Sequence, residues 1–291
     1  MITVMGATGH TGKRITELLL QAGEQVRALG RSESKLAGLA RAGAQVLAGD
    51  PTDAAFLTKA FRGADAVYTL LPYEVQTIDY HAAQKAQGEA IVKALHDSGT
   101  RHVVALSSVG ADLPSGTGPI VSLHAQEARL RGLEGANVLI LRAGALFENF
   151  YGALGFIKEQ GINGDAVAAD VAIPMIATRD IAEVAAKALR DRNWSGVVVR
   201  ELLGPRDLTY AEATRILGAR LGKPDLAYVQ LSYTELVEAL QQAGFSENLA
   251  SLSAELAQAF NERRVKSREG RKPESTTPTR FEDFVEELAS V

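Results

Sequence analysis

The chain begins with Met1-Ile2-Thr3-Val4-Met5, continues with Gly6-Ala7-Thr8-Gly9-His10-Thr11-Gly12, and then runs into KRITELLL at residues 13–20. Three glycines spaced three apart separate a short apolar run from a segment with helical apolar spacing. A buried strand, a tight glycine turn and a helix N-terminus in this order predict an anion cradle, because free backbone N–H groups and the helix dipole converge there. We therefore expect a pyrophosphate-binding turn made by Gly6, Thr8, Gly9, His10, Thr11 and Gly12. The alternative is a glycine-rich turn that binds no ligand.

The end of the next strand bears on which dinucleotide would bind. The strand expected at residues 25–29 is followed by Gly30-Arg31-Ser32, with Lys35 one helical turn further on. An NAD site places a carboxylate at this strand end, and a carboxylate would repel the 2′-phosphate of NADP. A guanidinium binds that phosphate through charge-assisted hydrogen bonds, so Arg31 and Lys35 favour NADP(H). Glu33 weakens the inference, and the alternative is a surface arginine at a solvated helix start.

Apolar runs alternate with helical segments from the start of the chain, which is typical of a parallel, doubly wound α/β sheet of the Rossmann type. Further strands are expected at 44–49, 66–71, 103–106 and 137–141, with helices at 53–61 and 79–97. We expect residues 1–150 to form the dinucleotide-binding domain and residues 151–291 a smaller substrate lobe interleaved with it. A segment near 171–203, with a late strand at 197–199, is expected to return to the sheet.

Beyond residue 150 the sequence announces helices mainly by their capping residues. Thr209 and Ser232 each precede a glutamate by three positions, which is the pattern of a capping box. Asp180 with Glu183 indicates another helix start, and we interpret these acidic residues as caps rather than catalytic groups. A last helix at 279–288 carries apolar residues on one face and is expected to dock on the body.

A basic stretch at residues 263–272 precedes that last helix. It has two interpretations, a nucleic-acid-binding arm and a solvated loop. The absence of aromatic residues and the acidic balance of the whole chain favour the loop.

In a doubly wound sheet the ligand lies beyond the carboxyl ends of the strands, so residues that follow strands are candidates for the site. The further cofactor candidates chosen on this basis are Asp50, Leu71, Pro72, Ser107, Ala143, Ala145, Phe147 and Asn149. Four aromatic residues near the same edge are candidates for stacking on a flat substrate, namely Tyr73, Phe147, Phe150 and Tyr151. Core packing is the alternative for each ring, and Ser107 with Ser108 either orients a substrate or merely ends the strand.

Composition excludes several classes of function. The 291 residues include no cysteine, which rules out disulfides, thiolate nucleophiles and cysteine metal sites, and we expect no metal centre. A net charge of −4 argues against general nucleic-acid affinity. No apolar run approaches the roughly 20 residues that span a bilayer. Because a strand is expected from residue 2, we expect no signal peptide. These features are those of a cytoplasmic protein.

Five stretches together resemble the NmrA-like branch of the short-chain dehydrogenase/reductase superfamily. They are residues 6–12, 49–50, 142–149, 176–182 and 277–281, so the resemblance runs nearly the full length of the chain. The resemblance implies a Rossmann-type fold that binds NADP(H). It also implies one of two activities, NADPH-dependent reduction of quinones or triphenylmethane-type dyes, or redox sensing without turnover.

One motif of the wider superfamily is missing. Ordinary members pair a tyrosine with a lysine four residues later, and none of the seven tyrosines here has a lysine at that offset. The stretch expected to hold the pair reads His124-Ala125-Gln126-Glu127-Ala128. We therefore expect an NADPH-dependent reductase that passes hydride to a quinone-like or other flat, electron-poor small molecule without that pair.

Two questions stay open at this point. His124 either donates a proton to the reduced product or binds backbone or water near the start of a helix. The alternative function is a non-catalytic NADP(H) sensor that acts through a regulatory protein partner.

Overall fold

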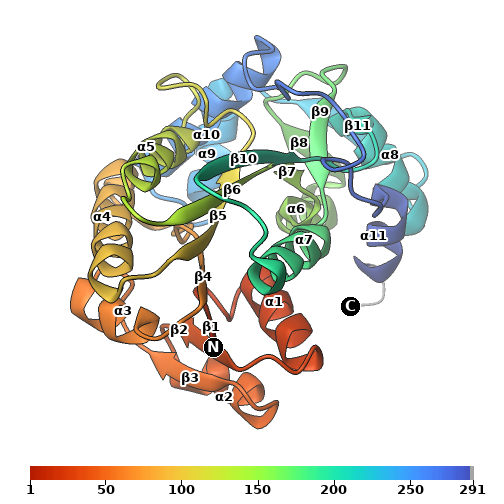
Figure 1. Ribbon diagram of the computed structural model, residues 1–291. Helices are drawn as coiled ribbons and strands as arrows, with labels where there is room; N and C mark the ends of the chain where they lie inside the picture. Colours follow the sequence, from red (N-terminus) through yellow and green to blue (C-terminus); the bar gives the residue numbers. More distant parts are fainter. Residues whose placement is uncertain (289–291) are drawn as a thin grey trace.

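A seven-stranded parallel sheet forms the centre of the protein (Figure 1). The computed structural model describes residues 1–288. The sheet order is β10-β6-β5-β4-β1-β2-β3. Its strands are β1 (Ile2–Val4), β2 (Val26–Gly30), β3 (Gln45–Ala48), β4 (Ala66–Thr69), β5 (His102–Ser108), β6 (Asn137–Ala143) and β10 (Val197–Leu202). Every neighbouring pair is parallel, and the order changes direction between β1 and β4. This confirms the predicted doubly wound, Rossmann-type α/β fold.

Helices cover both faces of the sheet. One face carries α1 (His10–Gln21), α2 (Glu33–Arg41) and α7 (Thr178–Asp191), and the other carries α3 (Ala54–Phe61), α4 (Tyr80–Ser98) and α5 (Ile120–Arg131). The strand sequences explain this arrangement, because successive side chains point to opposite faces. In β4, Ala66 and Tyr68 lie in the core beneath α1 and α7, whereas Val67 lies in the core beneath α3 and α4.

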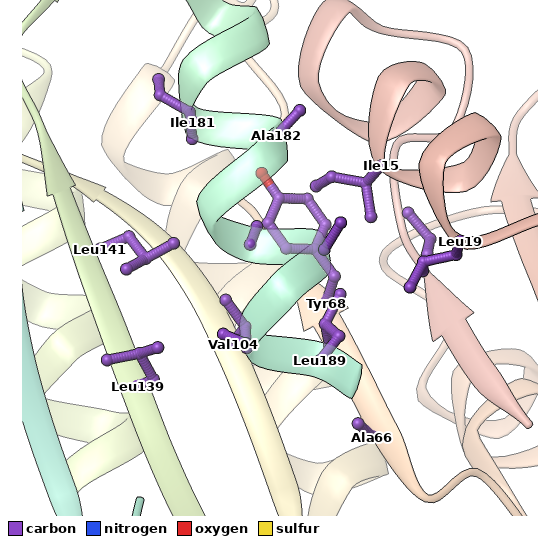
Figure 2. Close-up of a cluster of buried hydrophobic side chains, with 14 of the residues drawn as sticks. Ile15, Leu19, Ala66, Tyr68, Val104, Leu139, Leu141, Ile181, Ala182 and Leu189 are labelled. Carbon is purple, nitrogen blue, oxygen red and sulfur yellow. The ribbon is translucent and has the colours of Figure 1, made fainter. Parts of the chain in front are cut away.

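Tyr68 lies at the centre of the hydrophobic core between the sheet and the helices α1 and α7 (Figure 2). Ile15 and Leu19 approach its ring from α1, and Ile181 and Leu189 approach from α7. Burying one such side chain contributes roughly 1.5–3 kcal/mol, so this cluster holds the two helices against the sheet. A parallel sheet buried on both faces also accounts for the near-continuous apolar runs that predicted the strands.

After β6 the chain leaves the sheet and builds a smaller lobe. Its elements are β7 (Ala145–Leu146), η1 (Phe147–Asn149), α6 (Phe150–Gln160), β8 (Ile162–Asp165), β9 (Ile173–Ile176), β11 (Asp207–Leu208), α8 (Tyr210–Arg220), β12 (Ala227–Gln230), α9 (Tyr233–Gln242), α10 (Glu247–Asn261) and α11 (Phe281–Leu288). The short strands form two small sheets, β11-β9-β7 and β12-β8. The chain returns to the large sheet through α7 and β10, and β10 pairs with β6.

The predicted helix starts are partly confirmed. Ser232 and Glu235 form a reciprocal capping box at α9. Thr209 accepts the backbone N–H of Glu212 at α8, but the Glu212 carboxylate pairs with Arg206 instead of completing the box. The helix start expected near Asp180 is confirmed, since α7 begins at Thr178. The capping role of Asp180 is wrong, because its buried carboxylate accepts the backbone N–H and the hydroxyl of Thr279 at 3.0 and 2.6 Å. Asp180 therefore holds the C-terminal segment rather than capping α7.

The basic stretch at 263–272 lies along the body as a strap. Arg268 pairs with Asp112 at 2.8 Å, and Arg271 pairs with Asp207. Buried Glu201 accepts the backbone N–H of Arg268 at 2.9 Å. These contacts correct the interpretation as a freely solvated loop, because several of the cations are bound to carboxylates of the same chain. The last helix docks as predicted, with Phe281, Phe284, Val285 and Leu288 buried in the lobe core.

Within residues 1–288, no helix combines the length and the apolar character needed to cross a membrane.

Candidate cofactor and substrate site

The glycine turn after β1 has the geometry that its sequence predicts. Gly6 adopts a φ of +63°, a left-handed conformation that favours glycine. A Cβ on Gly12 would lie 2.3 Å from the carbonyl oxygen of Gly6, so α1 can pack this close to the turn only without a side chain there. A Cβ on Gly9 would meet only that same carbonyl oxygen, at 3.4 Å. Gly6 and Gly12 therefore shape the turn, and Gly9 keeps the space in front of it open.

The N-terminus of α1 offers unsatisfied donors to that space. Gly9 is the residue before the helix, no side chain caps the helix, and its first turn holds no acidic residue. By contrast, Asp53 caps α3 and Asp79 caps α4. Thr8 and His10 are exposed, whereas the buried hydroxyl of Thr11 accepts a hydrogen bond from Tyr68 at 3.2 Å. The backbone N–H of Thr11 faces no capping side chain, and the whole turn fits a phosphate group.

A cavity of about 450 Å³ lies beside the turn, beyond the ends of β2 and β3. It is lined by Arg31, Gly49, Asp50, Pro51, Glu74 and Gln87. The Asp50 carboxylate accepts the backbone N–H and the hydroxyl of Thr52 at 2.8 and 2.7 Å. Those hydrogen bonds, with a smaller contribution from Arg31, lower the pKa of Asp50, so it is ionised at neutral pH.

The cavity brings together two of the residues that were predicted from strand ends, Arg31 and Asp50. It also contains Glu74 and Gln87, which the sequence did not single out. Gln87 is buried, and its Oε1 has no hydrogen-bond partner. Lys35 is exposed on α2 and does not line the cavity.

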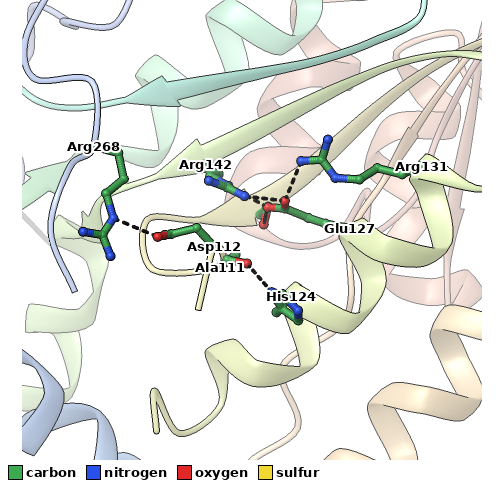
Figure 3. A network of polar contacts seen from close by, with 8 residues as sticks. Ala111, Asp112, His124, Glu127, Arg131, Arg142 and Arg268 are labelled. Atoms are coloured by element: carbon green, nitrogen blue, oxygen red, sulfur yellow. Dashed lines mark hydrogen bonds and ion pairs between the residues drawn. The ribbon is translucent and has the colours of Figure 1, made fainter. Parts of the chain in front are cut away.

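A network of charges lies where β5 and β6 end (Figure 3). Glu127, only 3% exposed on α5, accepts hydrogen bonds from the Ser107 hydroxyl at 2.7 Å and from Arg142 at 2.7 and 2.8 Å. Arg131 completes the network at 3.3 Å. The hydrogen bonds that Arg142 donates to Glu127 raise the pKa of Arg142. Ser107 therefore commits its proton to Glu127 and can offer only lone pairs to a bound molecule.

His124 lies one turn before Glu127 on the same helix. Its Nδ1 is 2.9 Å from the carbonyl oxygen of Ala111, so this nitrogen carries a proton and donates it to the backbone (Figure 3). The backbone-binding interpretation of His124 thus describes one of its two ring nitrogens. The other, Nε2, is the nitrogen left for proton transfer, and a catalytic role for His124 stays a prediction.

The four aromatic candidates divide into two pairs. Phe147 and Phe150 are 1% and 4% exposed, whereas Tyr73 and Tyr151 are 53% and 41% exposed. Both phenylalanines pack on Phe281 in the lobe core, with ring centroids 5.1 and 4.8 Å from it. Their burial argues for core packing rather than the predicted stacking on a substrate. Only the two tyrosines keep ring surface that a ligand can reach.

Tyr151 joins the lobe to the glycine turn. Its ring stacks on His10, with centroids 5.8 Å apart and planes 9° from parallel. The α6 helix thus places an aromatic side chain directly against the N-terminus of α1. Any molecule at that N-terminus meets both the sheet and the lobe.

The remaining strand-end candidates have mixed environments. Ala143 is buried, and its carbonyl accepts the N–H of Val109 at 2.8 Å. Ala145, Leu71 and Pro72 are half-buried, and Asn149 is exposed just before α6. Their contact with a cofactor stays a prediction.

The profile of the NmrA-like family matches residues 1–285. The chain belongs to this family. A (4-alkanoyl-5-oxo-2,5-dihydrofuran-3-yl)methyl phosphate reductase from Streptomyces griseus is 28% identical, over 96% of this chain and 91% of that protein.

Two solved structures share the fold over nearly all of both chains. An NADPH-dependent quinone oxidoreductase from Escherichia coli, crystallised with NADPH, superposes with a TM-score of 0.84 at 24% identity and covers 99% of each chain. A triphenylmethane reductase from Citrobacter sp., crystallised with NADP(H), gives a TM-score of 0.81 at 22% identity, over 99% of this chain and 100% of that one.

In this NmrA-like chain, the environments of Tyr73 and Tyr151 suit proton donation poorly. Burial raises the pKa of Tyr73, which is one of the two exposed candidates. Burial, with the charges of Glu148 and Glu287, likewise raises the pKa of Tyr151. A catalytic tyrosine needs a neighbouring cation that lowers its pKa, and the sequence supplies no lysine four residues after either one.

Proposed function

We propose that this chain is an NADPH-dependent reductase that passes hydride to a flat, electron-poor small molecule such as a quinone. The observation that carries the proposal is the joint placement of two sites at the carboxyl edge of the parallel sheet. The uncapped N-terminus of α1 fits a pyrophosphate, and the neighbouring cavity fits the adenosine end of the same dinucleotide. The reductase name of the Streptomyces relative and the cofactors in the two similar structures support it.

The proposal assigns each end of the cofactor to residues of this chain. The backbone N–H groups at residues 10–12 would hold the pyrophosphate across the open face of Gly9. Arg31 would bind the 2′-phosphate from the wall of the cavity. Bound NADPH supplies the hydride. The protein then has to position a flat acceptor and leave the product a source of a proton.

Ser107 and His124, near the end of β5, are the side chains considered as the source of that proton. Ser107 holds its hydroxyl proton in a hydrogen bond to Glu127, so it acts as an acceptor. His124 offers Nε2, which carries a proton when the imidazole is charged, and water is the other source. A quinone is a strong hydride acceptor, so its reduction does not require a tyrosine–lysine pair.

The test is NADPH oxidation at 340 nm against a panel of quinones, cationic dyes and enals. We expect turnover of at least one acceptor above the buffer rate, and loss of both turnover and NADPH binding in Gly9→Val. We expect His124→Ala to slow turnover, whereas His96→Ala, which removes an exposed histidine on α4, leaves it unchanged. Tight NADPH binding without turnover of any acceptor would refute the reductase and favour a sensor that acts through a protein partner.

A further inference from the structure

Arg31, the residue predicted to read the 2′-phosphate, is already engaged with an anion of its own chain. Its guanidinium Nη1 lies 2.8 Å from Oε1 of Glu74, and the two side chains are 66% and 34% exposed. Both line the cavity beyond β2 and β3. They come from separate parts of the chain, Arg31 from the end of β2 and Glu74 from the loop between β4 and α4.

The loop that carries Glu74 is fixed from its other side. The carbonyl of Val75 accepts the backbone N–H of Ser246 at 2.8 Å, and Ser246 caps α10. The backbone N–H of Tyr80 donates to Asn248 on the same helix at 2.9 Å. The lobe therefore holds Glu74 in a defined position opposite Arg31.

The polar groups of the cavity are mostly acceptors. Asp50 and Glu74 are carboxylates, and Arg31 is the cation among the lining residues. The lowered pKa of Asp50 keeps it charged at neutral pH. A 2′-phosphate in reach of Arg31 would thus arrive near two carboxylates and would have to displace one of them. A ribose 2′-hydroxyl would instead find acceptors and no like charge.

We propose that Glu74 is a specificity-determining residue of the dinucleotide site, which narrows the preference for NADPH over NADH. It neutralises Arg31 in the free protein and repels the 2′-phosphate, while it can accept a hydrogen bond from the 2′-hydroxyl of NADH. The inference rests on the proposed dinucleotide-binding function and concerns the choice between the two cofactors.

The test is the pair of dissociation constants for NADPH and NADH in wild type and Glu74→Gln, at one fixed ionic strength. Loss of an exposed ion pair and of one like charge near the phosphate predicts NADPH binding tighter by about fivefold to twentyfold. NADH binding should stay the same or weaken. The matched control is Glu33→Gln, which removes a charge two residues from Arg31 but outside the cavity lining, and should change either constant less than about twofold.

The same substitution in an Arg31→Ala protein distinguishes an effect of the Arg31–Glu74 ion pair from a general effect of charge. In Arg31→Ala the substitution Glu74→Gln should sharpen the preference for NADPH less than it does in wild type, because it then relieves only the repulsion of the 2′-phosphate and releases no cation. An unchanged NADPH-to-NADH ratio in Glu74→Gln, while Arg31→Ala lowers that ratio, overturns the inference but leaves the proposed function standing. If wild type binds neither dinucleotide, the proposed function itself is overturned, and this inference with it.

Discussion

Replacing Gly12 with alanine should destabilise the protein far more than the same change at Gly9. The Cβ added at Gly12 would lie 2.3 Å from the Gly6 carbonyl oxygen and 2.9 Å from that of Met5. Both obstacles are backbone atoms at the end of a buried strand, so they cannot rotate away. Relief requires α1 to move outward by roughly 1 Å, which disturbs the packing of its buried residues.

The structure allows the size of this effect to be estimated. Overpacking in a well-packed core costs about 1–3 kcal/mol, and a clash with rigid backbone belongs at the upper end of that range. For a protein of this length, about 3 kcal/mol corresponds to a fall in Tm of roughly 6–12 °C. At Gly9 the backbone is extended, with φ −90° and ψ 172°, and the nearest atom to an added Cβ is 3.4 Å away. Gly9→Ala should therefore cost less than about 1 kcal/mol.

The assay is urea and thermal unfolding of both variants, together with an NADPH titration. Gly12→Ala should lose stability first and binding as a consequence, whereas Gly9→Ala should keep its Tm and bind NADPH more weakly. Equal losses of Tm in the two variants, or a Gly12→Ala protein within about 2 °C of wild type, would refute the assignment of separate roles.

Three further predictions concern buried carboxylates. Glu127→Ala leaves the charge of Arg142 without its main partner and should cost about 3–5 kcal/mol in urea unfolding, with Glu127→Gln losing clearly less. Asp180→Ala leaves the N–H and hydroxyl of Thr279 unpaired, so it should cost about 2–4 kcal/mol and make the C-terminal helix more sensitive to limited proteolysis. Burial raises the pKa of Asp165 above its unfolded value, so the wild type loses stability as the pH rises above about 4. Asp165→Asn should therefore gain stability relative to the wild type between pH 4 and pH 8. A stability difference that does not depend on pH would contradict this prediction.

The first half of the fold could be predicted because its signals are local. The glycine turn, the apolar strands and the helix between them each depend on residues that are neighbours in sequence. Gly99 after α4 illustrates this, since a glycine just past a helix is a local signal and Gly99 ends α4 with a left-handed φ of +69°. The buried parallel sheet reinforces these signals, because each strand must be apolar on both faces.

The lobe was harder to predict because its elements depend on distant partners. The strands β7 and β11 have two residues each, and both are defined by their pairing with β9. A segment that short carries no periodicity of its own. Asp180 shows the same problem for a side chain, because its spacing from Glu183 imitates a cap while its real partner, Thr279, lies 99 residues away.

The parts of the candidate site that the backbone forms, at the glycine turn and the strand ends, could be predicted from the sequence. The parts that depend on pairs of side chains could not. The sequence identified Arg31 from its position after a strand, but its partner Glu74 comes from another loop and leaves no mark near Arg31. Gln87 was missed for the same reason, since an unpartnered amide is visible only once its surroundings are known.

Glu127 lies in the stretch where the tyrosine–lysine pair was expected, and it limits which groups nearby can donate a proton. In that pair a lysine supplies the positive charge that lowers the pKa of its tyrosine, and here the corresponding stretch places a carboxylate in the interior. Arg142 neutralises that carboxylate through two hydrogen bonds, so the network provides no free cation to activate a neighbour. Glu127 also accepts the hydrogen bond of the Ser107 hydroxyl. Under the proposed function, the proton that a reduced acceptor requires would come from His124 or from water. That source would suit an acceptor that needs no strong acid, such as a quinone.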